Sequence, residues 1–178
     1  MANKKKSGQI WISAILFMSL GIITIALVLT AAIPLVNKIA DKNTIIRTKE
    51  ILLKIDDTIK TVANEGPGSQ RQLDPLVIDK GELIITNGTY KLLWQMDTKA
   101  DIMEKDIEII EGNIHQTLNS TFVEEVNNMK VWVSSPNYNT TINSRFSNPF
   151  KGEYIITIKH TGKFDISTDN PIIELRVN

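Results

Sequence analysis

Three asparagines have the spacing that most directly suggests a chemical modification. Asn87, Asn119 and Asn139 are each followed two positions later by threonine, and no proline stands between. In an exported chain this pattern accepts an N-linked glycan on the side-chain amide, at a surface position. We therefore predict three candidate glycosylation sites. Each also has a simpler structural interpretation, because Asn87 precedes a glycine where a turn needs it and Asn139 lies in a polar segment.

Groups that could act in catalysis or bind a metal are few. His115 and His160 are the two histidines, there is no cysteine, and neither histidine has another metal-ligating residue at the usual spacing. Nucleophile-elbow and phosphate-loop motifs are absent from the sequence. We expect both histidines to be structural or exposed, and we expect no enzyme activity, no cofactor and no metal. Adjacent carboxylates are predicted to face solvent: Asp56 with Asp57, and Glu124 with Glu125.

The charge balance argues against nucleic acid as a partner. Three lysines stand in the first eight residues, and the rest of the chain holds 17 basic and 20 acidic groups. A nucleic-acid-binding protein normally carries a basic patch, and none stands out here.

A long uncharged segment near the N-terminus determines where the rest of the chain is located. Residues 10–36 contain no charged side chain and follow Lys4, Lys5 and Lys6. At about 1.5 Å per residue, a helix of this length crosses a bilayer core of about 30 Å. The lysines favour a cytoplasmic N-terminus, which places residues beyond 36 outside the cell membrane.

Three interpretations of this segment are open. Thr30, Ala31 and Ala32 offer small residues for a signal peptidase, but the apolar run is longer than the roughly 7–15 residues of a secretory signal. The second interpretation is a plain single-pass anchor. The third is a prepilin-type leader that is cut before the apolar helix.

The start of the chain resembles an archaeal type IV pilin precursor. The resemblance is carried by the run KKKSGQIWIS at residues 4–13 and by the apolar helix that follows. It implies that a prepilin peptidase cuts between Gly8 and Gln9, and that the whole apolar helix stays on the mature protein. Bacterial members usually have a glutamate where this chain has Ser13, so the departure favours an archaeal assignment.

What the resemblance implies is a structural subunit of a surface filament. Its partners would be membrane lipid before assembly, further copies of itself in a helical homo-oligomer, and the peptidase and assembly machinery. The head would provide adhesion or surface contact, with the filament extracellular. The alternative is an uncleaved, single-pass, membrane-anchored extracellular binding module that does not polymerise. A tethered exported hydrolase is a third hypothesis.

The helical pattern continues beyond the apolar segment. Leu52, Ile55, Ile59 and Val62 recur at three- and four-residue steps, which predicts an amphipathic helix with one face to cover. The Gly-Pro-Gly at residues 66–68 is expected to end it.

The remaining residues predict strands. The Asn-Gly dipeptide at 87–88 indicates a hairpin between residues 82–86 and 89–96. Trp94 and Trp132 are both predicted to be core residues. Further strands, a loop and a turn are expected as follows: strands 106–110 paired with 114–118, strand 129–134, surface loop 137–150, strand 153–160 followed by a turn at 161–163, and strand 172–177. Residues 101–111 and 122–128 fit either a strand or a short helix.

The predicted fold class is α+β, with one long N-terminal helix whose second half packs on an antiparallel sheet of about five to seven strands. We expect four segments: a cytoplasmic basic leader at 1–8, a transmembrane or filament-core helix at 9–36, its amphipathic continuation at 37–65, and a β-rich head at 69–178.

Overall fold

A computed structural model of the chain describes residues 4–121, 126–146 and 148–178, and it confirms the α+β class. Helix α1 (Lys4–Glu65) precedes nine strands in the described residues. Contacts divide the chain into two compact units, residues 1–40 and 41–178. The first unit is helical from Lys4 onward, and α1 continues through Pro34.

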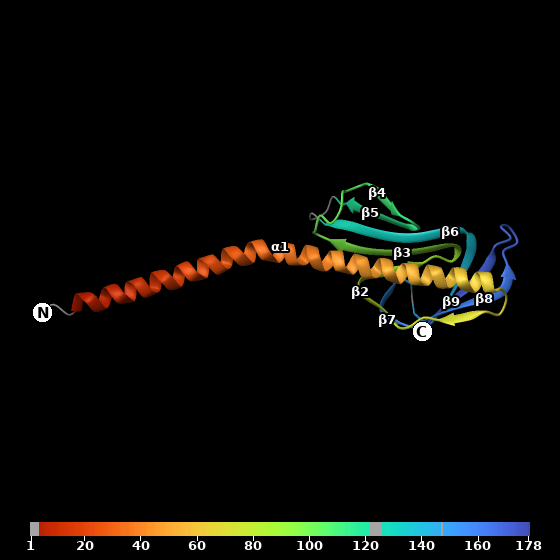
Figure 1. Cartoon of the computed structure of the whole chain (residues 1–178), viewed down its shortest axis with the longest axis horizontal. Coiled ribbons are helices and arrows are strands. Elements are labelled where there is room, and N and C mark those ends of the chain that lie inside the picture. Colours follow the sequence, from red (N-terminus) through yellow and green to blue (C-terminus); the bar gives the residue numbers. More distant parts are fainter. Residues whose placement is uncertain (1–3, 122–125, 147) are drawn as a thin grey trace. The chain divides into compact units, whose positions relative to one another are not determined.

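The second unit contains the sheet. Its strands are β1 (Gln70–Gln72), β2 (Leu76–Ile85), β3 (Gly88–Thr98), β4 (Glu108–Glu111), β5 (Ile114–Ser120), β6 (Asn127–Ser144), β7 (Phe150–Tyr154), β8 (Ile156–Phe164) and β9 (Pro171–Val177). Their order is β1-β8-β9-β6-β3-β2-β7, with β5 also paired to β6 and β4 paired to β5. The second part of α1 crosses one face of this sheet (Figure 1).

The core forms between α1 and the sheet because the helix presents a regular buried stripe. The predicted residues Leu52, Ile55, Ile59 and Val62 are all fully buried. They meet a sheet face rich in large side chains, including Tyr90, Leu92 and Trp94 of β3, which are buried as well. The amphipathic prediction for this part of α1 is therefore confirmed.

The end of the helix is also as predicted. α1 stops at Glu65, and Gly66 has a φ of 87°, the left-handed conformation that favours glycine. The Ser69 hydroxyl donates hydrogen bonds to the carbonyl oxygens of Val62 at 2.7 Å and Gly66 at 2.8 Å. One of the carbonyls left open at the helix end is thereby satisfied.

The predicted hairpin forms, but its first strand is longer than expected. β2 contains Gly81, where the pairing with β7 changes register between Ile78 and Leu83. Gly81 has a φ of 80°, and a Cβ there would lie 2.5 Å from the carbonyl oxygen of Gln95. Only glycine fits this close approach of β2 to β3.

Strand β6 corrects the predicted loop at 137–150. The strand runs to Ser144, and the three residues around Pro136 form an irregularity, since Tyr90 pairs with Ser135 while Thr89 pairs with Asn139. This bulge accommodates Pro136, so the strand continues beyond its predicted end at residue 134. The distal half of β6 pairs with β9 in parallel, so the sheet is not wholly antiparallel.

Other boundaries differ from the predictions. The predicted strand 153–160 divides into β7 and β8, and β8 continues to Phe164 through the predicted turn at 161–163. Strand 172–177 is confirmed as β9, and the predicted pairing of 106–110 with 114–118 is confirmed as β4 with β5. Residues 101–111 form no helix. The ambiguous segment 122–128 lies partly outside the described residues.

Candidate functional site

The apolar part of α1 is the first candidate site. From Trp11 to Ala40, all described side chains are exposed except that of Ala32, which is half-buried. By length and composition, this part of the helix is apolar enough to cross a membrane. A helix that is apolar on all sides is stable where lipid or another apolar surface covers it.

Three hydroxyl groups within this segment form hydrogen bonds to the backbone of their own helix. The hydroxyls of Ser19, Thr24 and Thr30 donate to carbonyl oxygens three or four residues earlier, at 2.8–2.9 Å. These contacts remove the need for water at those hydroxyls. These three hydroxyl groups can therefore reside in an apolar environment without water.

The leader residues singled out from the sequence lie at the start of α1. The helix begins at Lys4, so the backbone of Lys5, Lys6, Gly8 and Gln9 belongs to its first turns. The lysines therefore directly precede the apolar helix, and the Gly8–Gln9 bond lies at the junction between the two.

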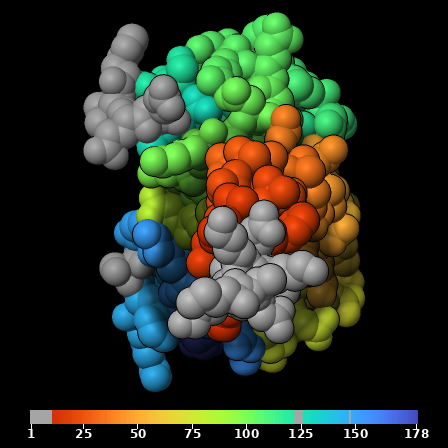
Figure 2. Space-filling model, turned by 90° about the vertical axis from the view of Figure 1, so that its left-hand side faces the viewer, coloured from red at the N-terminus to blue at the C-terminus, as the bar shows by residue number. Residues whose placement is uncertain are grey.

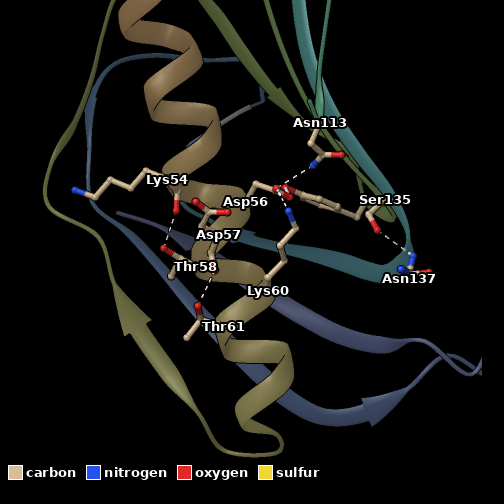
Figure 3. Close-up of polar contacts among 10 residues, drawn as sticks. Lys54, Asp56, Asp57, Thr58, Lys60, Thr61, Asn113, Ser135 and Asn137 are labelled. Atoms are coloured by element: carbon tan, nitrogen blue, oxygen red, sulfur yellow. Dashed lines mark hydrogen bonds and ion pairs between the residues drawn. The ribbon is translucent and has the colours of Figure 1, made fainter. Parts of the chain in front are cut away.

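The second half of α1 carries a buried carboxylate that the sequence analysis placed on the solvent side. Asp56 is fully buried and accepts hydrogen bonds from the Tyr90 hydroxyl at 2.8 Å and from the Asn113 amide at 2.9 Å. Lys60, one turn later, forms an ion pair with it at 2.6 Å. Figure 3 shows Lys60 and Asn113 converging on Asp56 from the helix and from the sheet.

The electrostatics of this cluster follow from burial. Burial, followed by the neighbouring Asp56 carboxylate, raises the pKa of Tyr90 well above its usual range. The hydrogen bond from Lys60 to Asp56 raises the pKa of Lys60. Tyr90 and Lys60 therefore stay protonated, so both continue to donate hydrogen bonds to Asp56. The prediction that Asp56 faces solvent is wrong, while Asp57 is exposed as predicted. Glu124 and Glu125 lie outside the described residues.

A second buried carboxylate, that of Asp41, lies on α1 at the start of the second unit. Asp41 accepts hydrogen bonds from the ammonium group of Lys80 in β2 and from the hydroxyl of Thr98 in β3. The sequence contains a signal that both carboxylates are buried. Their positions follow the same three- and four-residue spacing as the buried apolar residues of the α1 stripe. That stripe comprises Asp41, Ile45, Thr48, Leu52, Ile55, Ile59 and Val62, with Asp56 beside Ile55.

The histidines have structural surroundings. His160 is buried, and its Nδ1 accepts a hydrogen bond from the backbone N–H of Gly162 at 3.0 Å. His115 lies on the outer face of the sheet, where it stacks on Trp132 at 5.3 Å between ring centroids and pairs with Glu108 at 2.7 Å. Among the described residues, no group of His, Asp and Glu has the arrangement of a metal site.

Trp132 corrects a further prediction. Trp94 is in the core, but Trp132 lies half-buried on the opposite sheet face, beside His115 and with Lys91 5.4 Å from its ring centre. The alternation along residues 129–134 indicates two faces, and the buried face belongs to Met129, Val131 and Val133. One step along the strand therefore separates Trp132 from the core.

The three sequon asparagines differ in access. Asn87 is exposed at the β2–β3 turn, and its Oδ1 accepts the backbone N–H of Ile142 at 2.8 Å. Asn119 is half-buried in β5. Asn139 is half-buried in β6 between β3 and β9, and its Oδ1 accepts a hydrogen bond from Asn170 at 3.3 Å. Asn87 is thus the most accessible of the three.

Comparisons of the chain with models of known protein families, with characterised proteins and with solved structures give no match.

Proposed function

We propose that this chain is the structural subunit of an archaeal type IV pilus-like surface filament. The observation that carries the proposal is the helix α1, which serves two purposes in one element. Its first part is apolar on all sides and has no buried described residue before Asp41, whereas its second part forms the core of the head. Such a chain has one large apolar surface left to cover, first by lipid and then by copies of itself.

The leader supports the same proposal. The lysines at positions 4–6 orient the helix with its N-terminus in the cytoplasm, and the Gly8–Gln9 bond lies just before the apolar residues. Cleavage there would remove the charges and keep the full apolar helix. The head, with its three sequons, would be outside the cell, where it would provide adhesion or surface contact.

The decisive experiment is intact-mass spectrometry of the protein from membranes and from sheared cell-surface material. We expect a mature species that begins at Gln9 and is enriched in the sheared fraction. Additional mass on peptides with Asn87, Asn119 or Asn139 would report glycans. A species that retains residues 4–8 and stays in the membrane fraction would instead favour the non-polymerising anchored binding module.

Substitution of Gly8 tests the cleavage site directly. Gly8→Ile should block processing, because the resemblance implies a small residue before the cut. Gly21→Ile is the matched control, since a Cβ at Gly21 meets no atom within 4 Å. Normal processing of Gly8→Ile would contradict the assigned cleavage site.

A further inference from the structure

Helix α1 carries an exposed apolar side chain at every seventh residue from 39 to 53. Ile39, Ile46 and Leu53 are 52%, 46% and 39% exposed, and they are spaced seven residues apart. Seven residues are almost two helical turns, so the three side chains follow one face of α1. The α1 residues near the start of the second unit are drawn in orange in the space-filling view (Figure 2).

Charge is segregated along the same face. Lys42 is exposed near the start of the row, whereas Glu50 and Asp57 are exposed one turn to either side of Leu53. Among the described residues, none of these three forms a salt bridge. Lys54, which stands between the two acids, is paired with Asp74 at 2.9 Å.

The acidic end of the face is a shallow groove. It is lined by Glu50, Leu53, Lys54, Asp57, Thr58 and Thr61 of α1 together with Arg71. The hydroxyls of Thr58 and Thr61 turn back to helix carbonyls at 2.7 and 2.8 Å (Figure 3). Arg71 is paired with Glu65, so Leu53, Glu50 and Asp57 are the groups left for a contact.

We infer that this groove receives the Ile39–Lys42 turn of a second copy of the chain, aligned parallel and shifted by 14 residues. The inference rests on the proposed function, which gives all copies one membrane orientation and so excludes antiparallel pairing. The shift places Leu53 against Ile39 of the neighbour and Asp57 level with its Asn43, one residue from its Lys42. A shift of seven residues would instead place Asp57 against Glu50, and like charges repel.

The shift has a direct structural consequence. Fourteen residues correspond to about 21 Å along a helix, so the neighbour whose turn is received lies about 21 Å further in the N-to-C direction than the copy that receives it. The groove and the inserted turn are different surfaces of the chain, which makes the contact heterologous. A contact of this type does not close on itself and extends into a filament.

Cysteine cross-linking tests the register, and the chain offers a clean background because it has no cysteine. The full-length variant Ile39→Cys/Leu53→Cys, oxidised in sheared filaments, should give a ladder of disulfide-linked multimers on a non-reducing gel. The two positions are about 21 Å apart within one helix, well beyond the roughly 7 Å limit between Cα atoms, so any bond joins two copies.

Two matched pairs define the outcome. Ala40→Cys/Lys54→Cys keeps the 14-residue spacing but turns both positions by about 100° around the helix, and it should give no ladder. Ile46→Cys/Leu53→Cys reports the seven-residue register. A ladder from either control pair, or filaments without a ladder from the first variant, would overturn this inference while leaving the filament proposal intact. Absence of wild-type filaments would overturn the proposed function itself.

Charge reversal provides an independent readout. Lys42→Glu and Asp57→Lys should each reduce the amount of subunit in the sheared fraction at low salt, and the double variant should restore it. Failure of the double variant to exceed both single variants would also contradict the proposed pairing. Equal recovery of membrane-bound subunit in all variants is the control for expression and folding.

Discussion

In the second half of α1, side chains at every third or fourth position from Asp41 to Val62 are buried by the sheet, whereas in the first half the described side chains remain exposed or half-buried. The backbone conformation is the same in both halves. The difference lies in which sides of the helix are apolar. One half has an apolar face that this chain covers with its own sheet, and the other half is apolar all round and depends on its surroundings.

The comparison also concerns polar groups. In the apolar half, hydroxyls bond to their own helix backbone, as Ser19 and Thr24 do. In the second half, carboxylates are buried and bond to residues distant in sequence, as Asp56 does to Tyr90 and Asn113. Stability of the head should therefore depend on individual residues of the second half and be insensitive to the first.

Removal of Asp56 should have the largest effect. Asp56→Ala leaves the Tyr90 hydroxyl, the Asn113 amide and the Lys60 ammonium without their shared acceptor. A buried donor left without its acceptor costs about 1–3 kcal/mol of folding free energy, and two such donors, on Tyr90 and Asn113, are left here, whereas the Lys60 side chain is 40% exposed and can be hydrated. Thermal unfolding of the detergent-solubilised chain measures the loss. Asp57→Ala, one residue away and exposed, should stay within about 0.5 kcal/mol of wild type.

One identical substitution in the two halves tests the comparison most directly. Ile59→Ala removes a fully buried side chain and should cost about 2–5 kcal/mol in unfolding free energy. Ile25→Ala, at a side chain that is 61% exposed, should leave unfolding of the head unchanged. Comparable losses from both changes would contradict the division of α1 into two independent halves.

A charge in the apolar half should act on the membrane step alone. Ile22→Arg should weaken insertion by about 2.5–3.5 kcal/mol, because a charged side chain is placed near the middle of the apolar segment. Fractionation of cells measures the membrane-bound share, and Ile22→Leu is the matched control. A fall in the unfolding temperature of the head of Ile22→Arg would argue against the separation of roles.

The smallest effect is expected from a change of pH. Residues 10–36 carry no acidic or basic side chain, so any dependence of stability on pH comes from groups outside this segment. In the turn after β8, the hydroxyl of Ser167 and the backbone N–H groups of Ser167 and Thr168 lower the pKa of Asp165 to about 2. A lowered pKa in the fold contributes stability that is present above the ordinary value of 3.8 and is lost as pH falls towards 2.

Asp165→Asn removes this share, so its stability should decline less than that of wild type between pH 4 and about 2. At pH 6–8 the two proteins should differ by a constant offset. Thermal unfolding across this pH series measures the difference. Parallel curves down to pH 2 would show that the turn does not stabilise the charged form of Asp165.

The elements predicted correctly are those with strong local signals. The β2–β3 hairpin around Asn87, the helix end before Gly66 and the stripe of Leu52 to Val62 each depend on a few adjacent residues, and each is found in the structure. The hairpin closes between Thr86 and Lys91, so its connection is wider than the two-residue turn that the Asn-Gly dipeptide predicts. The leader, sequon and filament assignments stay predictions, because they concern a peptidase, a glycan and neighbouring copies.

What the sequence did not reveal was set by distant partners. The distal half of β6 is polar, and its strand conformation depends on β3 and β9 on either side of it. Asp56 lies next to the buried stripe of α1, but the sequence does not show that Tyr90 and Asn113 supply the donors that allow its carboxylate to be buried. Trp132 is apolar enough for the core, and only the register of β6 places it outside.

The two buried carboxylates also determine how the chain would respond to mechanical tension along α1. Asp41 and Asp56 are 15 residues apart, about 22 Å along the helix, and each is bound to fixed positions of the sheet. If the helix slid by one turn, both carboxylates would lose their donors in the same movement. A pulling force must therefore break two separated buried clusters together, so the head would resist steady tension and then release abruptly.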